Sequence, residues 1–271
     1  MVNHISFPGL GIELEVSRAA FSIFGMDIYT YGILIAAGLL LAFWYAVREA
    51  DRVGLKQDDL LNMFIVAVPT AIVCARLYYV VFSWDSYKND LLSIFDIRSG
   101  GLAIYGGVIG AVLAVYIYCR VKNVKIGTVL DILAVGLLIG QAVGRWGNFV
   151  NGEAFGSSTT LPWAMTIVCD GKTVTEGAHP TFLYESLWNA AGIAVLIAYK
   201  RKTVFRGELF CGYMVWYGTG RTLIEGLRTD SLYWGAFRVS QLLSAALVIA
   251  GIALISVNRR KARLKNNNAE E

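Results

Sequence analysis

Long apolar segments separated by short polar ones dominate the chain from residue 27 to residue 257. Each is close to the roughly 20 residues that a helix needs to cross the hydrocarbon core of a bilayer. Seven such segments cover residues 27–47, 60–82, 101–119, 126–145, 181–199, 208–227 and 238–257. The pattern therefore predicts an all-α polytopic membrane protein with seven transmembrane helices.

Two of these segments carry glycines at four-residue intervals. The fourth has Gly136, Gly140 and Gly144, and the third has Gly106 and Gly110. Small residues at this spacing let neighbouring helices approach closely in lipid. We therefore expect both segments to pack tightly against other helices.

The longest polar interruption covers residues 146–180, between the fourth and fifth predicted spans. Within it, Asp170-Gly171 separates two strand-like segments, 164–168 and 172–175, and Asp-Gly is a strong hairpin signal. We expect a small external cap containing a β-hairpin, inserted in a single membrane domain of residues 1–257. Residues 258–271 are basic and then polar, which predicts a disordered cytoplasmic tail.

The distribution of lysine and arginine predicts the orientation of the spans. Alternate segments outside the spans hold fifteen of these residues on one side and seven on the other. Because cytoplasmic loops carry the excess, we expect the N-terminus outside and the C-terminus in the cytoplasm. Residues 1–25 lack the basic start and short apolar core of a signal peptide, so the first span is expected to remain in the mature protein.

Composition supports a membrane location. Hydrophobic residues make up 56% of the 271 residues and charged residues only 16%, whereas soluble domains carry roughly 25% charged residues. The net charge of +4 could suggest nucleic acid, but the basic residues form short clusters between apolar segments, so no nucleic-acid partner is expected. The four cysteines predict neither a disulfide framework nor a metal site.

Polar side chains of six predicted spans converge on one depth, near the outer headgroups. Ionisable groups within a span are costly, and by default they indicate a functional site that faces the bundle interior. The residues placed there are Tyr31, Arg76, Tyr105, Arg145, Asn148, His179, Tyr184, Glu185, Arg221, Glu225 and Arg228.

Several of these residues also have a structural interpretation. Arg221 and Glu225 have the four-residue spacing of a helical ion pair, so a structural pair and a functional role are both open. Arg76 could extend to the headgroups or pair with a carboxylate, and we favour a structural role there. His179 is as well suited to orienting a loop as to catalysis. Tyr31 alone could be an interfacial belt residue.

One stretch at the outer end of the fourth span is harder to explain by structure alone. Residues 144–156 read Gly-Arg-Trp-Gly-Asn-Phe-Val-Asn-Gly-Glu-Ala-Phe-Gly, with a cation, two amides, a carboxylate and four glycines. Glycine lets a ligand approach the backbone, and arginine holds a phosphate through two parallel hydrogen bonds. Lipid phosphate is the nearest anion at that depth, so Arg145 is the first candidate for binding it.

This stretch resembles the signature of bacterial prolipoprotein diacylglyceryl transferases. Every fixed position of that signature is met, at Gly144, Arg145, Gly147, Asn148, Phe149, Asn151, Glu153 and Gly156. Further similarities cover most of the chain, at Tyr31-Gly32, Ala75-Arg76-Leu77, residues 179–185, Gly220-Arg221, Glu225, Arg228 and Gln241. Seven spans with the N-terminus outside also fit this family.

The resemblance implies an enzyme of the bacterial cytoplasmic membrane, with its site near the outer leaflet and with no cofactor or metal. It would transfer the diacylglyceryl group of phosphatidylglycerol to the lipobox cysteine thiol of a prolipoprotein signal peptide. A thioether would form and glycerol phosphate would leave, as the first step of lipoprotein maturation. The implied catalytic residues are Arg145, Arg228, Tyr105, His179 and Glu185. The implied residues for binding phosphatidylglycerol are Arg145, Asn148, Asn151, Glu153, Gly156, Tyr31 and Arg228.

Two positions depart from the family pattern. Residues 104–107 read Ile-Tyr-Gly-Gly where many members have His-Gly-Gly, so Tyr105 replaces a histidine often assigned an active role. Residues 239–241 read Val-Ser-Gln and lack the usual Met-Gly before the glutamine. The first departure bears on the identity of the catalytic base.

A phenol is little ionised at neutral pH and is a poor general base. We therefore expect Tyr105 to orient substrate through a hydrogen bond. The base could then be His179, Glu185 or Glu153, or the arginines could activate the thiol without a dedicated base.

Two functions from other classes would use similar features. A transporter would place buried charges near the midplane, with inverted repeats and broken helices, but no such repeat is visible and the polar cluster lies towards the outside. A non-catalytic lipid-binding protein would also need arginines at headgroup depth. Transfer of a labelled diacylglyceryl group to a lipobox peptide distinguishes the three.

Overall fold

In a computed structural model of the chain, the structure is described for residues 2–23, 25–97, 100–229, 233–235 and 237–270. The contacts divide the chain into two compact units, residues 1–46 with 130–271 and residues 47–129. The first unit contains the strands of the predicted cap and most of the candidate site. The single membrane domain over residues 1–257 stays a prediction.

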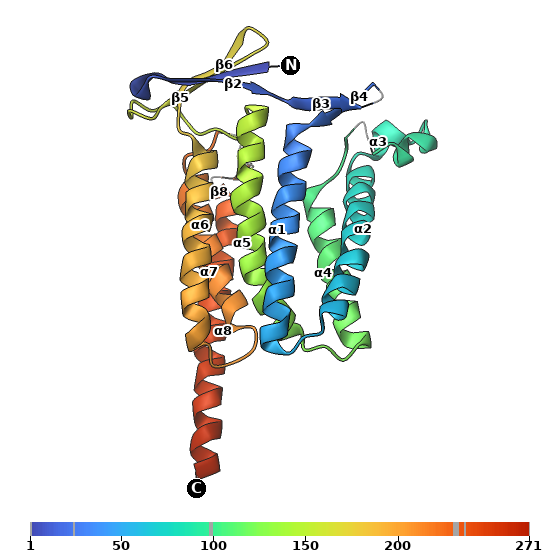
Figure 1. The fold of residues 1–271 in the computed structure, drawn as a ribbon, viewed down its shortest axis with the longest axis vertical. Coiled ribbons are helices and arrows are strands. Elements are labelled where there is room, and N and C mark those ends of the chain that lie inside the picture. Colours follow the sequence, from blue (N-terminus) through green and yellow to red (C-terminus); the bar gives the residue numbers. More distant parts are fainter. Residues whose placement is uncertain (1, 24, 98–99, 230–232, 236, 271) are drawn as a thin grey trace. The chain divides into compact units, whose positions relative to one another are not determined.

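The long helices follow the predicted spans closely. They are α1 (Thr30–Val53), α2 (Gln57–Phe82), α4 (Ile104–Val121), α5 (Ile126–Asn151), α6 (Thr181–Tyr199), α7 (Glu208–Glu225) and α8 (Val239–Glu270) (Figure 1). Shorter helical segments are η1 (Pro8–Leu10), α3 (Trp84–Tyr87), η2 (Leu91–Phe95) and η3 (Lys200–Lys202). The protein is therefore mostly helical.

Six of these helices are long and apolar enough to cross a membrane, judged by length and composition over the described residues. The helix outside this group is α7, which spans 18 residues and carries Glu208, Arg221 and Glu225. The predicted count of seven is thus supported for six spans. Whether α7 can also cross a membrane depends on how its charged side chains are paired.

Several helices extend beyond the predicted ends of their spans, and two of these extensions bear on other predictions. α5 continues to Asn151, so residues 146–151 of the expected cap belong to the helix. α8 continues to Glu270, and the disorder predicted for residues 258–271 stays a prediction. Residues 259–265 read Arg-Arg-Lys-Ala-Arg-Leu-Lys, and all of these are strong helix formers.

The predicted hairpin is present, as β5 (Met165–Cys169) and β6 (Lys172–Ala178). Asp170 and Gly171 between them both have positive φ, 50° and 75°, as a two-residue hairpin turn of type I′ requires. β1 (Val2–Phe7) and β2 (Ile12–Ser17), which were not predicted, extend it to an antiparallel sheet of order β2-β1-β5-β6. The cap thus combines two distant segments of the chain.

Two smaller hairpins complete the strands of the described residues. β3 (Ala19–Ile23) pairs with β4 (Met26–Tyr29) directly before α1. β7 (Tyr233–Trp234) pairs with β8 (Phe237–Arg238) before α8. Both hairpins lead the chain into a long helix.

Within the first unit, α6 packs against α7 and α7 against α8 beneath the sheet (Figure 1). α5 joins them through a buried cluster that includes Leu138, Leu196 and Leu209. One buried cluster joins the sheet to the adjacent helix ends and contains Ile5, Phe7, Phe149, Val150, Met165, Ile167 and Phe182. It packs β1 and β5 against the last turn of α5 and the first turn of α6. The signature at the end of α5 is therefore held between the sheet and the helices.

The close packing expected from the glycines is confirmed for α4 and not for α5. A Cβ atom on Gly110 of α4 would lie only 2.7 Å from Cys74 Cβ on α2. On α5, a Cβ on Gly144 would make an ordinary contact at 3.4 Å from Ile35 Cδ1, and the space beside Gly140 is open. The glycines of α4 therefore bring it close to α2, whereas alanine would fit at Gly140.

Candidate active site

Three arginines and two glutamates form one ion-pair cluster where α5, α6 and α7 approach the sheet. Glu185 of α6 lies at its centre, with Oε2 2.5 Å from Arg145 Nη2 and Oε1 3.1 Å from Arg221 Nη1. Arg228 Nη1 is 3.7 Å from the same Oε1. Glu225 Oε2 is 2.7 Å from Arg221 Nη2 and 4.0 Å from Arg228 Nε. The cluster therefore connects residues from three separate helices.

The cluster is buried, and its charges are paired. The side chain of Glu225 is 1% exposed, and that of Arg145, the most exposed member, is 23% exposed. Charge is costly to bury unless it is paired, and each of the two glutamates contacts more than one arginine. Arg145 is the member that an anion can reach most easily.

Two tryptophans fix the register between α6 and α7. The indole Nε1 of Trp188 donates to Trp216 O at 3.1 Å, and Trp216 Nε1 donates to Trp188 O at 3.0 Å. Their rings stack with centroids 4.7 Å apart. Glu185 precedes Trp188 by one turn and Arg221 follows Trp216 by about a turn and a half, so this reciprocal pair also aligns Glu185 with Arg221.

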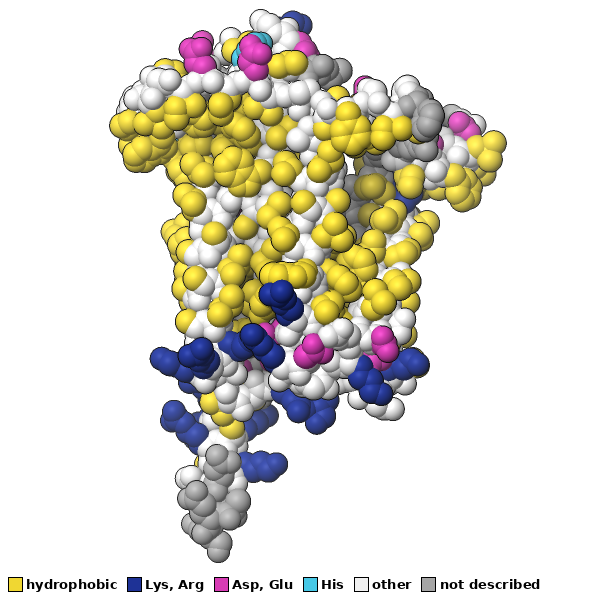
Figure 2. All heavy atoms as spheres, in the orientation of Figure 1, with side chains coloured by type: hydrophobic (Ala, Val, Ile, Leu, Met, Phe, Trp, Pro, Cys, Tyr) yellow, Lys and Arg dark blue, Asp and Glu magenta, His cyan; other side chains and the backbone are white. Residues whose placement is uncertain are grey.

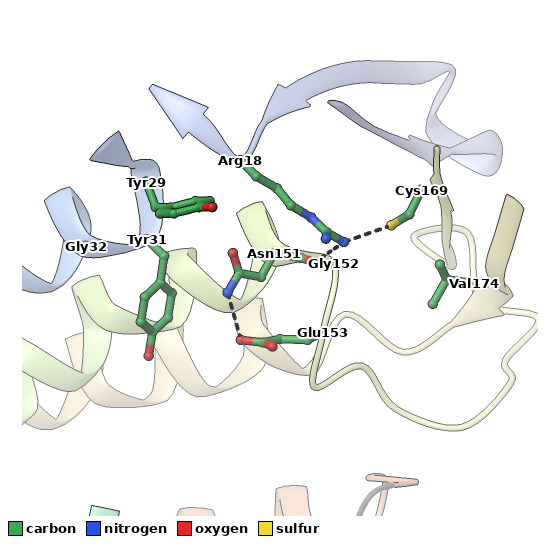
Figure 3. A pocket seen from close by; sticks show the side chains of 9 residues that line it. All are labelled: Arg18, Tyr29, Tyr31, Gly32, Asn151, Gly152, Glu153, Cys169 and Val174. Atoms are coloured by element: carbon green, nitrogen blue, oxygen red, sulfur yellow. Dashed lines mark hydrogen bonds between the residues drawn. The ribbon is translucent and has the colours of Figure 1, made fainter. Parts of the chain in front are cut away.

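Arg145 is also connected to the amides of the signature. Its Nη1 donates to Asn148 Oδ1 at 3.0 Å, and Asn148 Nδ2 donates to Glu153 Oε1 at 3.0 Å. Asn151 Nδ2 donates to the same carboxylate oxygen at 3.2 Å (Figure 3). Four of the predicted lipid-binding residues thus form one hydrogen-bonded chain.

Tyr31, at the start of α1, packs against the signature. A Cβ atom on Gly147 would lie 2.5 Å from Tyr31 Cδ2, so glycine is required for this approach. The phenol ring of Tyr31 also lines a cavity that it shares with Asn151 and Glu153 (Figure 3).

The cavity has a volume of about 720 Å³ and lies at the end of α5. It is lined by Arg18, Tyr29, Tyr31, Gly32, Asn151, Gly152, Glu153, Cys169 and Val174 (Figure 3). Its volume falls within the range of small-molecule sites. Arg18 enters it from the N-terminal segment, where its Nη2 donates to Asn151 O at 3.0 Å and to Cys169 Sγ at 3.4 Å.

His179 holds the loop before α6. Its backbone N–H donates to Ser157 O at 3.0 Å, and its carbonyl accepts from Gly156 N at 2.9 Å. Its ring Nδ1 lies 3.1 Å from the hydroxyl of Tyr184, to which Trp163 Nε1 also donates at 2.7 Å. These contacts favour the loop-orienting role over the catalytic one.

Gly156 packs closely against the start of α6 and the segment that follows α7. A Cβ atom there would lie 2.8 Å from His179 Cβ and 3.0 Å from Leu227 O. Its backbone also forms a β-bridge with Arg228. The absence of a side chain at Gly156 therefore helps to place Arg228.

The second unit contains the other two sequence candidates. Arg76 donates from all three of its nitrogens to five backbone carbonyls at 2.7–3.0 Å, those of Ser93, Ile94, Asp96, Gly100 and Gly101. The structural role favoured for Arg76 is confirmed, with carbonyls as its partners. Tyr105 lies in the first turn of α4 and is exposed, and its role stays a prediction.

Sequence reasoning identified most of the cluster but not every residue around it. The Arg221–Glu225 ion pair is confirmed. Arg221 also contacts Glu185, so the same residue belongs to the structural pair and to the candidate site. Arg18, Tyr29 and Cys169 at the cavity were missed. Arg18 is the only cation before the first span, which is the one signal that could have identified it. Among the described residues, no group of three His, Cys, Asp or Glu side chains is placed to hold a metal ion.

Comparisons with known proteins agree with one another. The model of a family described as prolipoprotein diacylglyceryl transferase matches residues 18–257. A protein of Clostridioides difficile is 46% identical over 257 residues, which cover 94% of this chain and 100% of that protein. A protein of Finegoldia magna is 48% identical over 253 residues, 93% of this chain and 99% of its own. Both are named phosphatidylglycerol–prolipoprotein diacylglyceryl transferase.

Proposed function

Because the chain belongs to the prolipoprotein diacylglyceryl transferase family, we propose that its arginine cluster is where diacylglyceryl transfer takes place. The chain transfers a diacylglyceryl group from phosphatidylglycerol to a prolipoprotein, the first step of lipoprotein maturation. The acceptor is the thiol of the lipobox cysteine in the signal peptide. The cluster of Arg145, Glu185 and Arg221 is the observation that carries this assignment.

The reaction exchanges a carbon–oxygen bond for a carbon–sulfur bond. The cysteine thiolate is the nucleophilic form of the residue. It attacks the carbon of the diacylglyceryl group that is bonded to the phosphate oxygen. The bond from that carbon to the phosphate oxygen breaks, a thioether forms, and glycerol phosphate leaves with the electron pair. The thiol proton passes to a base or to the departing phosphate. No oxidant or reductant is needed.

The barrier reflects negative charge that develops on the departing phosphate. Donors fixed in a dry site stabilise such charge far more than water does. Arg145 is held by Glu185 and Asn148, so its guanidinium is already oriented before substrate binds. We assign it the bidentate contact to the phosphate, with Arg228 as a second cation and Tyr31 beside the lipid.

The carboxylates of Glu185 and Glu153 suit different tasks. Glu185 has both oxygens engaged by arginines, so it serves to orient these cations. Glu153 is exposed at the cavity, and among the described residues the contacts to its carboxylate are those of Asn148 and Asn151 to Oε1. Glu153 is therefore our choice for the group that accepts the thiol proton, with its two amide partners facing the headgroup.

We include α7 as a seventh span because its charges are compensated at both ends. At its start, the fully buried Glu208 lies 2.6 Å from Arg259 of α8 and accepts a hydrogen bond from Tyr199. At its end, Arg221 and Glu225 belong to the ion-pair cluster. Ionised groups in spans occur mainly when they are paired and face the bundle interior.

The proposed orientation places the N-terminus outside and the site near the outer leaflet. Within the first unit, apolar side chains follow the helices, and lysine and arginine gather at the helix ends away from the sheet (Figure 2). These basic residues include Lys200, Arg201, Lys202, Arg206 and Arg259. An excess of positive charge marks the cytoplasmic side.

The test is a transfer assay with the purified full-length protein. Phosphatidylglycerol labelled in its diacylglyceryl part is incubated with a lipobox peptide, and a peptide with serine in place of cysteine is the control. We expect labelled thioether and glycerol phosphate in equal amounts, and no product from the serine peptide. Binding of the lipid without transfer would indicate a lipid-binding protein, and lipid movement between leaflets without transfer would indicate a transporter.

A further inference from the structure

The C-terminal end of α5 requires partners for its last four carbonyl groups, because no helical N–H follows them. Two of these carbonyls are satisfied by the next residues of the chain. Glu153 N donates to Asn148 O at 3.0 Å, and Gly152 N donates to Phe149 O at 3.1 Å. With Gly152 at a φ of +67°, this is a Schellman motif. It leaves the last two carbonyls of the helix to other donors.

Side chains of the N-terminal segment supply both of these donors. Asn3 Nδ2 donates to Val150 O at 2.7 Å, and Arg18 Nη2 donates to Asn151 O at 3.0 Å. Asn3 is only 1% exposed, so a water molecule could not easily replace its amide. A cation such as Arg18 at this end of a helix also interacts favourably with the helix dipole.

Strand β1 determines where the amide of Asn3 lies. β1 is central in its sheet, with Asn3 opposite Val16 of β2 and Cys169 of β5. Successive side chains of a strand point to opposite faces, and along β1 Asn3 and Ile5 are buried while His4 is exposed. The buried face is the one that meets the end of α5, so the pairing of β1 delivers the amide of Asn3 to Val150.

The same helix end carries the amides that hold Glu153. Asn148 and Asn151 both donate to Glu153 Oε1, and Asn148 also accepts from Arg145. A shift of the last turn of α5 would therefore move the carboxylate and the amides relative to Arg145.

We propose that Asn3 and Arg18 are positioning residues for the transfer reaction, acting by fixing the end of α5 that holds Asn148, Asn151 and Glu153. This inference rests on the proposed function. It extends the functional architecture to Asn3, which lies before the residues 18–257 that the family model matches. The N-terminal strands are thereby part of the catalytic framework.

The first test is Asn3→Ala, with His4→Ala as the matched control. His4 is the next residue of the same strand and lies on its exposed face. We expect Asn3→Ala to lower kcat per folded molecule by about tenfold, the effect of one lost buried hydrogen bond, with a smaller change in KM for the peptide. His4→Ala should retain the wild-type kcat. A purely structural role would lower the yield of folded protein and leave kcat unchanged.

The second test uses Asn3→Asp, whose carboxylate cannot donate to Val150 O but whose protonated acid can. The ratio of its kcat to that of the wild type should rise as pH falls, whereas the ratio for Asn3→Ala should stay flat. Arg18→Ala, which alters a partly exposed residue, should also lower kcat.

Several outcomes would overturn the inference. The inference is wrong if Asn3→Ala keeps the wild-type kcat. It is also wrong if the kcat of Asn3→Asp, divided by that of the wild type, does not change with pH. If the Asn3 variants do not fold, an Arg18→Ala variant that keeps the wild-type kcat would overturn the inference. An inactive wild-type protein would contradict the proposed function instead, so the two failures are distinguishable.

Discussion

Two arginines within predicted spans differ in what their partners leave for a substrate. Arg76 directs its five N–H groups to five carbonyls, so its capacity as a donor is used up by the loop that it holds. The contacts described for Arg145 use one N–H towards Asn148 and one towards Glu185. Arg145 can therefore still bind a phosphate. The sequence favoured a structural role for Arg76 and phosphate binding for Arg145, but it could not identify the partners that distinguish the two.

The replacement of the family histidine by Tyr105 leads to a prediction for single residues. A neutral tyrosine and a neutral histidine can each donate one hydrogen bond. We therefore expect Tyr105→His to keep substantial transfer activity. Tyr105→Phe should lose about 1–3 kcal/mol of transition-state stabilisation, the cost of one missing hydrogen bond. The measurement is kcat/KM for each variant with the labelled lipid and the lipobox peptide.

The pH profile of these variants tests the same assignment. If Tyr105 only orients substrate, the profile of Tyr105→Phe should keep every ionisation seen in the wild type. An activity-linked ionisation that disappears in Tyr105→Phe would make Tyr105 the base. Full activity of Tyr105→Phe would show that the hydroxyl plays no part.

At the scale of elements, apolar periodicity was sufficient for the helices and insufficient for the sheet. The fifth predicted span, 181–199, has the same bounds as α6, because Pro180 precedes the segment and three basic residues, 200–202, follow it. β1 was missed because its partner β5 lies about 160 residues away along the chain, and β2 was missed although it pairs locally with β1. Local sequence contains no signal for such non-local pairing. The capping role of Asn3 was hidden for the same reason.

Close approach at Gly156 gives a prediction at this scale. In Gly156→Ala the new methyl group would meet His179 Cβ and Leu227 O, and it should displace the loop from the end of α7. We expect at least a tenfold loss of kcat/KM, equivalent to about 1.4 kcal/mol. Gly140→Ala is the matched control, because a Cβ there meets no atom within 4 Å and alanine favours helix. Equal activity of the two variants would show that close packing at Gly156 is irrelevant.

At the scale of the whole molecule, the charges that disqualify α7 as an isolated span are those that tie it to its neighbours. Glu208 pairs with Arg259 of α8, and Arg221 pairs with Glu185 of α6 as well as with Glu225 of its own helix. A hydropathy scale based on composition therefore overestimates the cost of burying α7. The sequence predicted seven spans from length, and it predicted the depth of the site from the alternation of positive loops. It could not predict which charges pair, because partners such as Arg145 and Glu185 come together only through tertiary packing.

The orientation predicts which residues a membrane-impermeant thiol reagent reaches. In a background without the four native cysteines, Lys172→Cys should react from outside intact cells. Lys261→Cys should react only after the cytoplasmic side is opened, because the positive tail lies inside. The reverse pattern would place the ion-pair cluster near the inner leaflet and would contradict the proposed depth of the site.

The central claim, that the cluster around Arg145 stabilises the departing phosphate, is tested most directly by the kcat of Arg145→Lys measured beside that of Arg259→Lys. Both arginines contact a buried glutamate of the first unit, but Arg259 lies at the opposite end of α7 from the cluster. Lysine keeps the charge and loses the planar bidentate fork. The account predicts that Arg145→Lys loses about a hundredfold or more in kcat while Arg259→Lys remains close to the wild type. Near-normal turnover by folded Arg145→Lys, or an equal loss in both variants, would contradict it.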